Sequence, residues 1–151
     1  MTFGELIERL GDKLGVEIED AGGAFALEID GKTVVLQQAD DDLVLLRTDL
    51  GEIPPDRRDT FAATALEANY LYRGTGGSTL AVNPSDGHIH LEKYNWLERL
   101  DGDKAFDMIT RFAETAAFWH RTKDEMPGDG GGDPGETPAP PYADAINLIQ
   151  V

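Results

Sequence analysis

Two Asp-Gly dipeptides, at 30–31 and 86–87, stand between short segments rich in apolar residues, and the segment before the first alternates at Phe25, Leu27 and Ile29. Residues 25–29 and 33–38 flank the first dipeptide, and residues 88–96 follow the second. Asp-Gly favours the positive φ angles of tight primed turns, which join neighbouring strands as hairpins. Strands joined by hairpins are antiparallel, whereas parallel strands need long crossovers. The sequence therefore predicts a largely antiparallel sheet, which with the helices below gives an α+β domain.

Three helices are expected around these strands. Thr2 and Glu5 form a capping box, and apolar residues at helical spacing predict a helix over 3–14 that Gly15 stops. Pro55-Asp56 opens a second helix that ends at Gly74, and Asp101 or Asp103 caps a third. Further strands are expected at 43–50 and 79–82. The predicted order is helix, three strands, helix, two or three strands, helix.

The composition of the chain changes sharply at Asp124. The last 28 residues contain five Gly, five Pro and six acids but no Lys or Arg, and only their end, YADAINLIQV, is apolar. Such a segment cannot build a core, so we expect a folded domain at 1–123 and a flexible tail at 124–151. Without the six acids of the tail, 23 acids remain against 13 bases, so the domain itself carries a charge of −10.

The charge and composition exclude several classes of function. A protein of net charge −16 lacks the clustered Lys and Arg that nucleic acid requires, and no apolar run is long enough to span a membrane. No basic and apolar N-terminal signal is present, and there is no Cys, so we expect a soluble cytoplasmic protein. An acidic surface suits solubility or a basic protein partner.

No catalytic, metal or cofactor site is predicted. His88 and His90 share one face of a strand, but zinc needs three or four converging ligands and nothing brings His120 near them. The acidic run 40–42 lacks the spacing of a calcium loop. The glycine-rich segment 74–78 follows a helix instead of preceding one, so it does not present a helix N-terminus to phosphate. We therefore expect a protein that is not an enzyme and holds no cofactor.

The second helix is apolar on more than one side. A helix with this pattern is buried on more than one side. Either it lies centrally within one subunit or its second side meets another subunit, and periodicity alone supports both interpretations equally.

Several segments together resemble the class I type III secretion chaperones, the Tir-chaperone family. They are LEANYLY at 66–72, GGSTLAV at 76–82, IHLEKY at 89–94, LERLD at 97–101 and the end of the last helix at 112–119. The resemblance covers roughly residues 1–122 and includes the order of the elements. It implies a small acidic homodimer that binds the N-terminal segment of a secreted effector in extended form, keeps it soluble and delivers it to a secretion ATPase.

The resemblance also implies roles for particular residues. The dimer interface is expected at Phe61, Leu66, Tyr70, Leu80 and Val82. The client-binding surface is expected at Leu6, Leu10, Leu14, Val34, Leu36 and Leu45. Plain packing in the core explains the client-binding set equally well, because a helix or strand that buries one face has the same spacing.

Two alternatives stay open. A regulatory or adaptor domain of the same fold, binding a cytosolic protein without a role in secretion, is the second functional interpretation. The tail beyond the last helix is longer than is usual in the family. Its apolar end either docks on a client patch or sheet edge of its own or a neighbouring chain, or the tail serves only as a disordered solubilising segment.

Overall fold

A computed structural model describes residues 1–16 and 23–130 of the chain. The elements follow in the order α1 (Phe3–Leu14), β1 (Ala24–Ile29), β2 (Lys32–Asp40), β3 (Leu43–Glu52), α2 (Arg58–Asn69), β4 (Thr79–Val82), β5 (His88–Trp96) and α3 (Gly102–Glu125). Short 3-10 turns, η1 to η3, lie at Pro55–Arg57, Tyr70–Tyr72 and Leu97–Arg99. The predicted α+β class and order of elements are confirmed.

The five strands form one antiparallel sheet in the order β1-β2-β3-β5-β4. Asp30 and Gly31 have φ angles of 50° and 73° and close the β1–β2 hairpin with the predicted primed turn. Gly87, with φ 76°, ends the loop between β4 and β5. Strand β3 pairs with β5 and not with the next strand along the chain, β4. The short strand β4 therefore lies at the edge of the sheet, beside β5.

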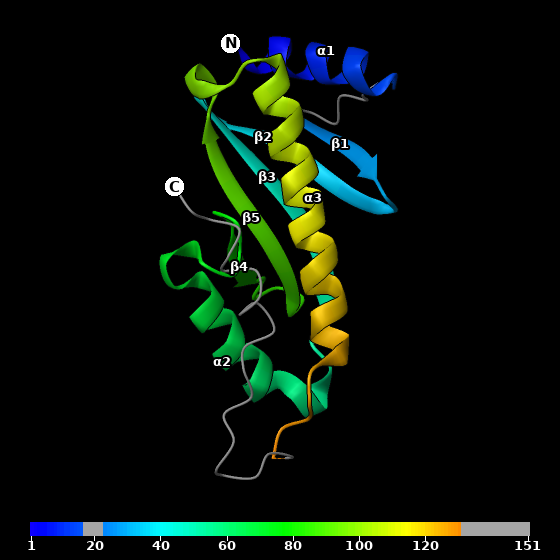
Figure 1. Ribbon diagram of the computed structural model, residues 1–151, viewed down its shortest axis with the longest axis vertical. Coiled ribbons are helices and arrows are strands. Elements are labelled where there is room, and N and C mark those ends of the chain that lie inside the picture. The colour runs from blue at the N-terminus through cyan, green and yellow to red at the C-terminus, as the bar shows by residue number, and fades with distance from the viewer. Residues whose placement is uncertain (17–22, 131–151) are drawn as a thin grey trace.

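Helix α1 begins and ends as predicted. The Thr2 hydroxyl accepts the N–H of Glu5, the Glu5 carboxylate accepts the N–H of Thr2, and Gly15 ends the helix at φ 67°. The buried side of α1 packs near α3, where Lys13 pairs with Asp103 at 2.5 Å. Figure 1 shows α1 lying across the end of the molecule at which α3 begins.

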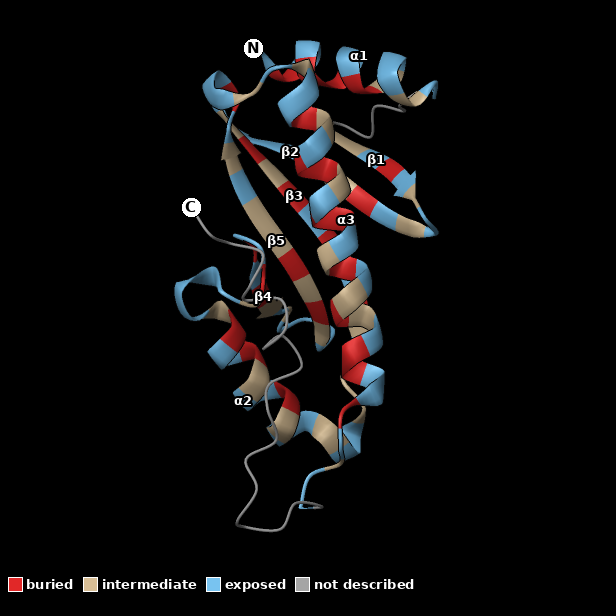
Figure 2. Ribbon diagram, in the orientation of Figure 1, coloured by how far each residue is buried: buried red, intermediate tan, exposed pale blue. Residues whose placement is uncertain are grey.

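Helix α3 runs along one face of the sheet and closes the core (Figure 1). Asp101, one of the two predicted caps, accepts the N–H of Lys104 and starts the helix. Figure 2 shows the buried residues of α3 on the side toward the strands. The largest fully buried side chains are Trp119, Phe112, Leu6, Leu10, Leu36, Leu46, Leu50, Ile89, Leu91, Leu97, Ile109 and Val34.

Helix α2 ends at Asn69, five residues before the predicted stop at Gly74. Tyr70 leaves the helix with ψ 115°, and Leu71 and Tyr72 take positive φ angles of 52° and 55°. Bulky residues rarely adopt this conformation, which costs about 1–2 kcal/mol per residue. Because α2 ends early, Tyr70, Leu71 and Tyr72 do not continue the helix as the sequence predicts.

The described chain continues to Gly130, five residues beyond the end of α3 at Glu125. Met126 is buried, and Asp129 binds the first turn of α2. The boundary at 123/124 stays a prediction, and residues 131–151 of the predicted tail lie outside the described residues.

Candidate protein-binding surfaces

Apart from Val16, which follows α1, the exposed large apolar side chains of the described residues fall into two sets. The first, here called the helix patch, consists of residues that follow one another from α2 through η2, with one residue of β4: Leu66, Tyr70, Leu71, Tyr72 and Val82. The second, here called the sheet patch, lies on the face of the sheet opposite the core: Leu43, Leu45, Tyr94 and Trp96. Exposed apolar side chains that gather in this way mark interaction surfaces more often than isolated ones do.

The helix patch is held in place by Asn69. The Asn69 side-chain amide binds both backbone polar groups of Leu80, which ties the end of α2 to the edge strand β4. The edge of β4 is therefore partly occupied by a side chain, and the residues after Asn69 are left on the surface. The side chains of Leu66 and Tyr70 are 72% and 66% exposed.

The residues predicted for a dimer interface divide into two groups. Leu66, Tyr70 and Val82 are exposed and belong to the helix patch. Phe61 and Leu80 are buried, and the ring of Phe61 packs edge-on against Trp119 with centroids 6.1 Å apart. Phe61 and Leu80 therefore support the helix patch from inside the subunit and are not on its surface.

The sheet patch follows from the register of β3 and β5. Leu43 lies opposite Trp96, and Leu45 lies opposite Tyr94. Side chains of directly opposed residues on one face are neighbours, so the four form two adjacent rows. Tyr94 is 57% and Trp96 49% exposed, whereas Leu43 and Leu45 are half-buried beneath them. Within residues 1–16 and 23–130, no helix covers this face of β3 and β5.

Most of the residues predicted to bind a client lie in the core. Leu6, Leu10, Val34 and Leu36 have at most 1% of their surface exposed, because α1 and the inner face of β2 pack against α3 and the rest of the sheet. Their burial agrees with plain packing in the core, and a client-binding role for them stays a prediction. Leu14 and Leu45 are half-buried, and a client-binding role for them stays a prediction.

Tyr94, Trp96 and Leu43 were missed from the sequence. From the sequence, residues 88–96 were expected to form a strand, and only His88 and His90 were considered on this face. A signal was available, since the run LVLL at 43–46 is apolar at every position and the end of β5 carries two aromatic residues on its outer face. A strand that is apolar on both faces in an antiparallel sheet is covered on both faces.

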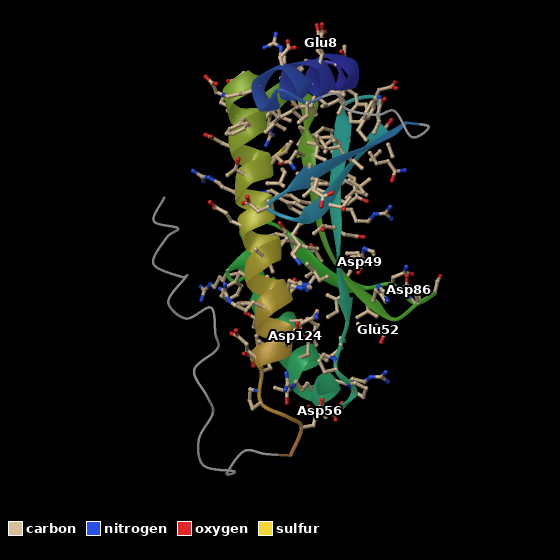
Figure 3. All side chains as sticks on the ribbon, turned by 90° about the vertical axis from the view of Figure 1, so that its right-hand side faces the viewer. Glu8, Asp49, Glu52, Asp56, Asp86 and Asp124 are labelled. Atoms are coloured by element: carbon tan, nitrogen blue, oxygen red, sulfur yellow. The ribbon has the colours of Figure 1, made fainter. Side chains whose placement is uncertain are left out.

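Acidic residues surround His88 at the opposite end of β3 and β5. In the His88 ring, Nδ1 lies 2.8 Å from Asp49 Oδ2 and Nε2 lies 3.8 Å from Glu52 Oε1. The backbone N–H of His88 donates to Asp86 Oδ1 at 2.8 Å. Figure 3 shows Asp49, Glu52 and Asp86 at one corner of the molecule. The outer face of the sheet thus changes from apolar at Trp96 to acidic at His88.

These contacts shift two pKa values. The hydrogen bond that the His88 ring donates to Asp49, together with the nearby carboxylates, raises the pKa of His88 above its ordinary value. Partial burial raises the pKa of Asp49, but hydrogen bonds from His88 and from the N–H of Gly51 outweigh it and leave that pKa lowered. When His88 is protonated, it forms an ion pair with Asp49 between neighbouring strands.

The histidines do not converge with other ligands in the described part of the chain. His120 lies on α3, and its Nδ1 is 3.2 Å from the carbonyl oxygen of Leu50. His88 and His90, in contrast, belong to the outer face of β5. Among residues 1–16 and 23–130, no three His, Asp or Glu side chains are placed to hold a metal ion. The loop at 74–78 is instead fixed by its carbonyl oxygens, which accept from Trp119 Nε1 and Lys93 Nζ.

No helix in the described part of the chain is both long enough and apolar enough to cross a membrane. The sequence model of the Tir chaperone protein (CesT) family matches residues 5–120. The chain belongs to the Tir chaperone protein (CesT) family. The resemblance found from the sequence is thereby confirmed.

Solved structures share the fold of this CesT-family chain. A chain of the HopA1–SchA chaperone–effector complex is 19% identical with a TM-score of 0.62, and the match covers 82% of this chain and 94% of that one. The Yersinia pestis type III secretion chaperone SycH, solved with a stable fragment of YscM2, gives 21% identity and a TM-score of 0.60, with 75% and 95% covered.

The fold is not confined to chaperones. YbjN of E. coli, described as a putative transcription regulator, matches with 12% identity and a TM-score of 0.58 over 80% of this chain and 90% of that one. At these identities each structural match shows the fold alone. A comparison with curated proteins gave no match.

Proposed function

We propose that this protein is a type III secretion chaperone, a homodimer that holds the N-terminal segment of a secreted effector in extended form and keeps it soluble for secretion. The family match over residues 5–120 carries the proposal. The outer surface agrees with it, because two apolar patches lie on a strongly acidic scaffold that opposes aggregation.

The helix patch is the proposed dimer interface. In a two-fold dimer the same surface of each copy meets the other, so the interface must be complementary to itself. An apolar patch meets this requirement. Aromatic residues are enriched in interface cores, and Tyr70 and Tyr72 provide two such rings beside Leu66. The predicted interface residues Phe61 and Leu80 act in this proposal by supporting the patch.

The sheet patch is the proposed client surface. An extended segment along the outer face would meet Trp96 and Tyr94 first and the carboxylates around His88 further on. A client segment that fits this surface therefore carries apolar residues followed by basic ones. Burial of two aromatic side chains contributes more to binding than an equal area of polar surface.

Other parts of the proposal rest on the family. Class I type III secretion chaperones act in the bacterial cytoplasm, have no enzymatic activity and need no cofactor, and they deliver clients to a secretion ATPase. The same is proposed for this chain. The ATPase is proposed as a further partner that binds the acidic surface.

Co-expression with N-terminal fragments of candidate effectors, followed by native mass spectrometry, tests the proposal. The expected complex contains two copies of this chain and one fragment. Secretion of the effector should also fall when the gene for this chain is deleted. A single-copy protein that retains no effector fragment contradicts the proposal.

The fold shared with YbjN keeps a regulatory or adaptor role as the second candidate. In that case the partner remains in the cytosol, and deletion of this chain changes no secreted protein.

A further inference from the structure

The chain leaves the end of α3 by a fixed route. The carbonyl oxygen of Asp124 accepts a hydrogen bond from Arg57, and Met126 is 6% exposed. The carboxylate of Asp129 then accepts the backbone N–H groups of Asp59 and Thr60, at 3.1 and 2.8 Å. These two N–H groups lack partners within a helix, so Asp129 caps α2 from outside it. The tail therefore starts from the first turn of α2.

The helix patch lies within reach of this starting point. Eleven residues separate Asp59 from Tyr70, which corresponds to about 17 Å along α2. Residues 131–141 also number eleven, and a flexible chain of that length has an end-to-end distance of roughly 18 Å. The sheet patch is further away, because Trp96 and Leu43 lie at the end of the sheet near α1, opposite the end where α2 starts (Figure 1).

The sequence after the linker is amphipathic. At 100° per residue, four apolar residues of 142–151 share one side: Tyr142, Ala145, Ile146 and Ile149. The polar residues of the same segment lie on the other side, together with Leu148 and Val151: Asp144, Asn147 and Gln150. No other stretch after Gly130 contains a large aliphatic side chain. An apolar face of this size matches a patch of exposed Leu and Tyr side chains.

We infer that residues 142–151 dock on the helix patch of their own chain and compete there with a second copy. The competition with a second copy depends on the dimer interface proposed above, whereas the docking itself does not. The tail covers the patch while the protein is a single copy, and pairing of two copies displaces both tails. Leu66, Tyr70 and Leu71 are then covered by the tail in the single copy and by the second copy in the dimer.

The tether makes weak docking sufficient. A short flexible linker gives an effective concentration on the order of 1 mM, so a segment with a dissociation constant near 0.3 mM occupies the patch about three-quarters of the time. Both copies must release their tails to pair. Tail docking lowers the fraction of open patches about fourfold in each copy. The dimer dissociation constant therefore rises by the square of that factor, roughly twentyfold.

Full-length variants with matched charges test the inference. The double variant Ile146→Asp/Ile149→Asp adds two negative charges to the apolar side. Its control, Asn147→Asp/Gln150→Glu, adds two negative charges to the polar side. Dimer dissociation constants are measured by mass photometry and sedimentation. Hydrogen exchange of residues 66–72 is measured in the dilute, single-copy protein.

The Ile variant is expected to dimerise roughly twentyfold more tightly than the natural chain, with faster exchange at 66–72 in single copies. The control is expected to behave like the natural chain. Equal exchange in all three proteins overturns the docking. Changed exchange without any dimer supports the docking and refutes the proposed interface. A natural chain that is fully dimeric at about 1 nM contradicts competition by the tail. Protection at 43–45 and 94–96, in place of 66–72, assigns the tail to the sheet patch and refutes the inference.

Discussion

The side chain of Asn69 completes the edge of the sheet at Leu80. Its Nδ2 donates to the carbonyl oxygen of Leu80 at 3.0 Å, and its Oδ1 accepts the N–H of Leu80 at 2.9 Å. One side chain thus replaces a neighbouring strand for one residue of β4 and fixes the place where α2 stops. The exposed side chains after Asn69 owe their position to this pair of bonds.

Replacing Asn69 with Ala should destabilise the protein by about 1–2 kcal/mol, because two part-buried hydrogen bonds are lost while Ala favours the helix more than Asn does. Urea unfolding measures the loss. Gln37→Ala removes an exposed amide side chain from β2 and serves as the control, with no more than a small change expected. Equal stability of the Asn69→Ala protein and the natural chain would show that the edge of β4 does not need this clamp.

The helix patch is expected to control dimer formation. Leu66→Glu places a charge where an apolar interface is proposed and should weaken the dimer at least tenfold, or about 1.4 kcal/mol. Sedimentation equilibrium gives the dissociation constant, and circular dichroism should show an unchanged fold because Leu66 is 72% exposed. Ala117→Glu adds the same charge at an exposed position of α3 and should leave the dimer intact. If Ala117→Glu weakens the dimer equally, added charge and not the patch is responsible.

The sheet patch is expected to control client binding. Two Tyr→Ala variants make a matched pair, since Tyr94 is 57% and Tyr70 66% exposed. Tyr94→Ala should weaken binding of an effector fragment about tenfold without affecting the dimer, because it removes an aromatic contact from the client surface only. Tyr70→Ala should weaken the dimer. Calorimetry with the fragment and sedimentation separate the two effects, and a loss of client affinity in both variants would refute the division of roles.

The fold was predictable wherever the signal was local. The capping box of Thr2 and Glu5, the Asp30-Gly31 turn and the cap at Asp101 each involve residues close in sequence, and all three are present. The end of α2 was not predictable in this way. It depends on the pairing of Asn69 with Leu80, eleven residues away, which no local pattern encodes.

The binding surfaces were harder to predict than the fold. Leu6 and Leu10 have the helical spacing of a binding face, but the same spacing describes the face that α1 buries against α3. Periodicity identifies a side that is covered without identifying what covers it. Tyr94 and Trp96 needed the register of β3 and β5, because only that pairing places them beside Leu45 and Leu43.

Stability should depend on pH through His88 and Asp49. The raised pKa of His88 means that its pairing stabilises the fold below its ordinary pKa of 6.5, and that this contribution is lost as the pH rises through the raised value. The lowered pKa of Asp49 means that its contribution is present above the ordinary 3.8 and is lost as the pH falls through the lowered value. The pair is therefore strongest in mildly acidic solution.

His88→Gln keeps a hydrogen-bond donor but does not titrate. The variant should therefore be clearly less stable than the natural chain at about pH 5.5 and almost equally stable at about pH 9. Thermal unfolding at the two pH values measures the difference. Asp49→Asn should remove most of the effect of His88→Gln when the two changes are combined, because the partner carboxylate is then absent. Additive effects at mildly acidic pH would show that His88 owes its raised pKa to Glu52 and Asp86 and that the pairing with Asp49 contributes nothing of its own.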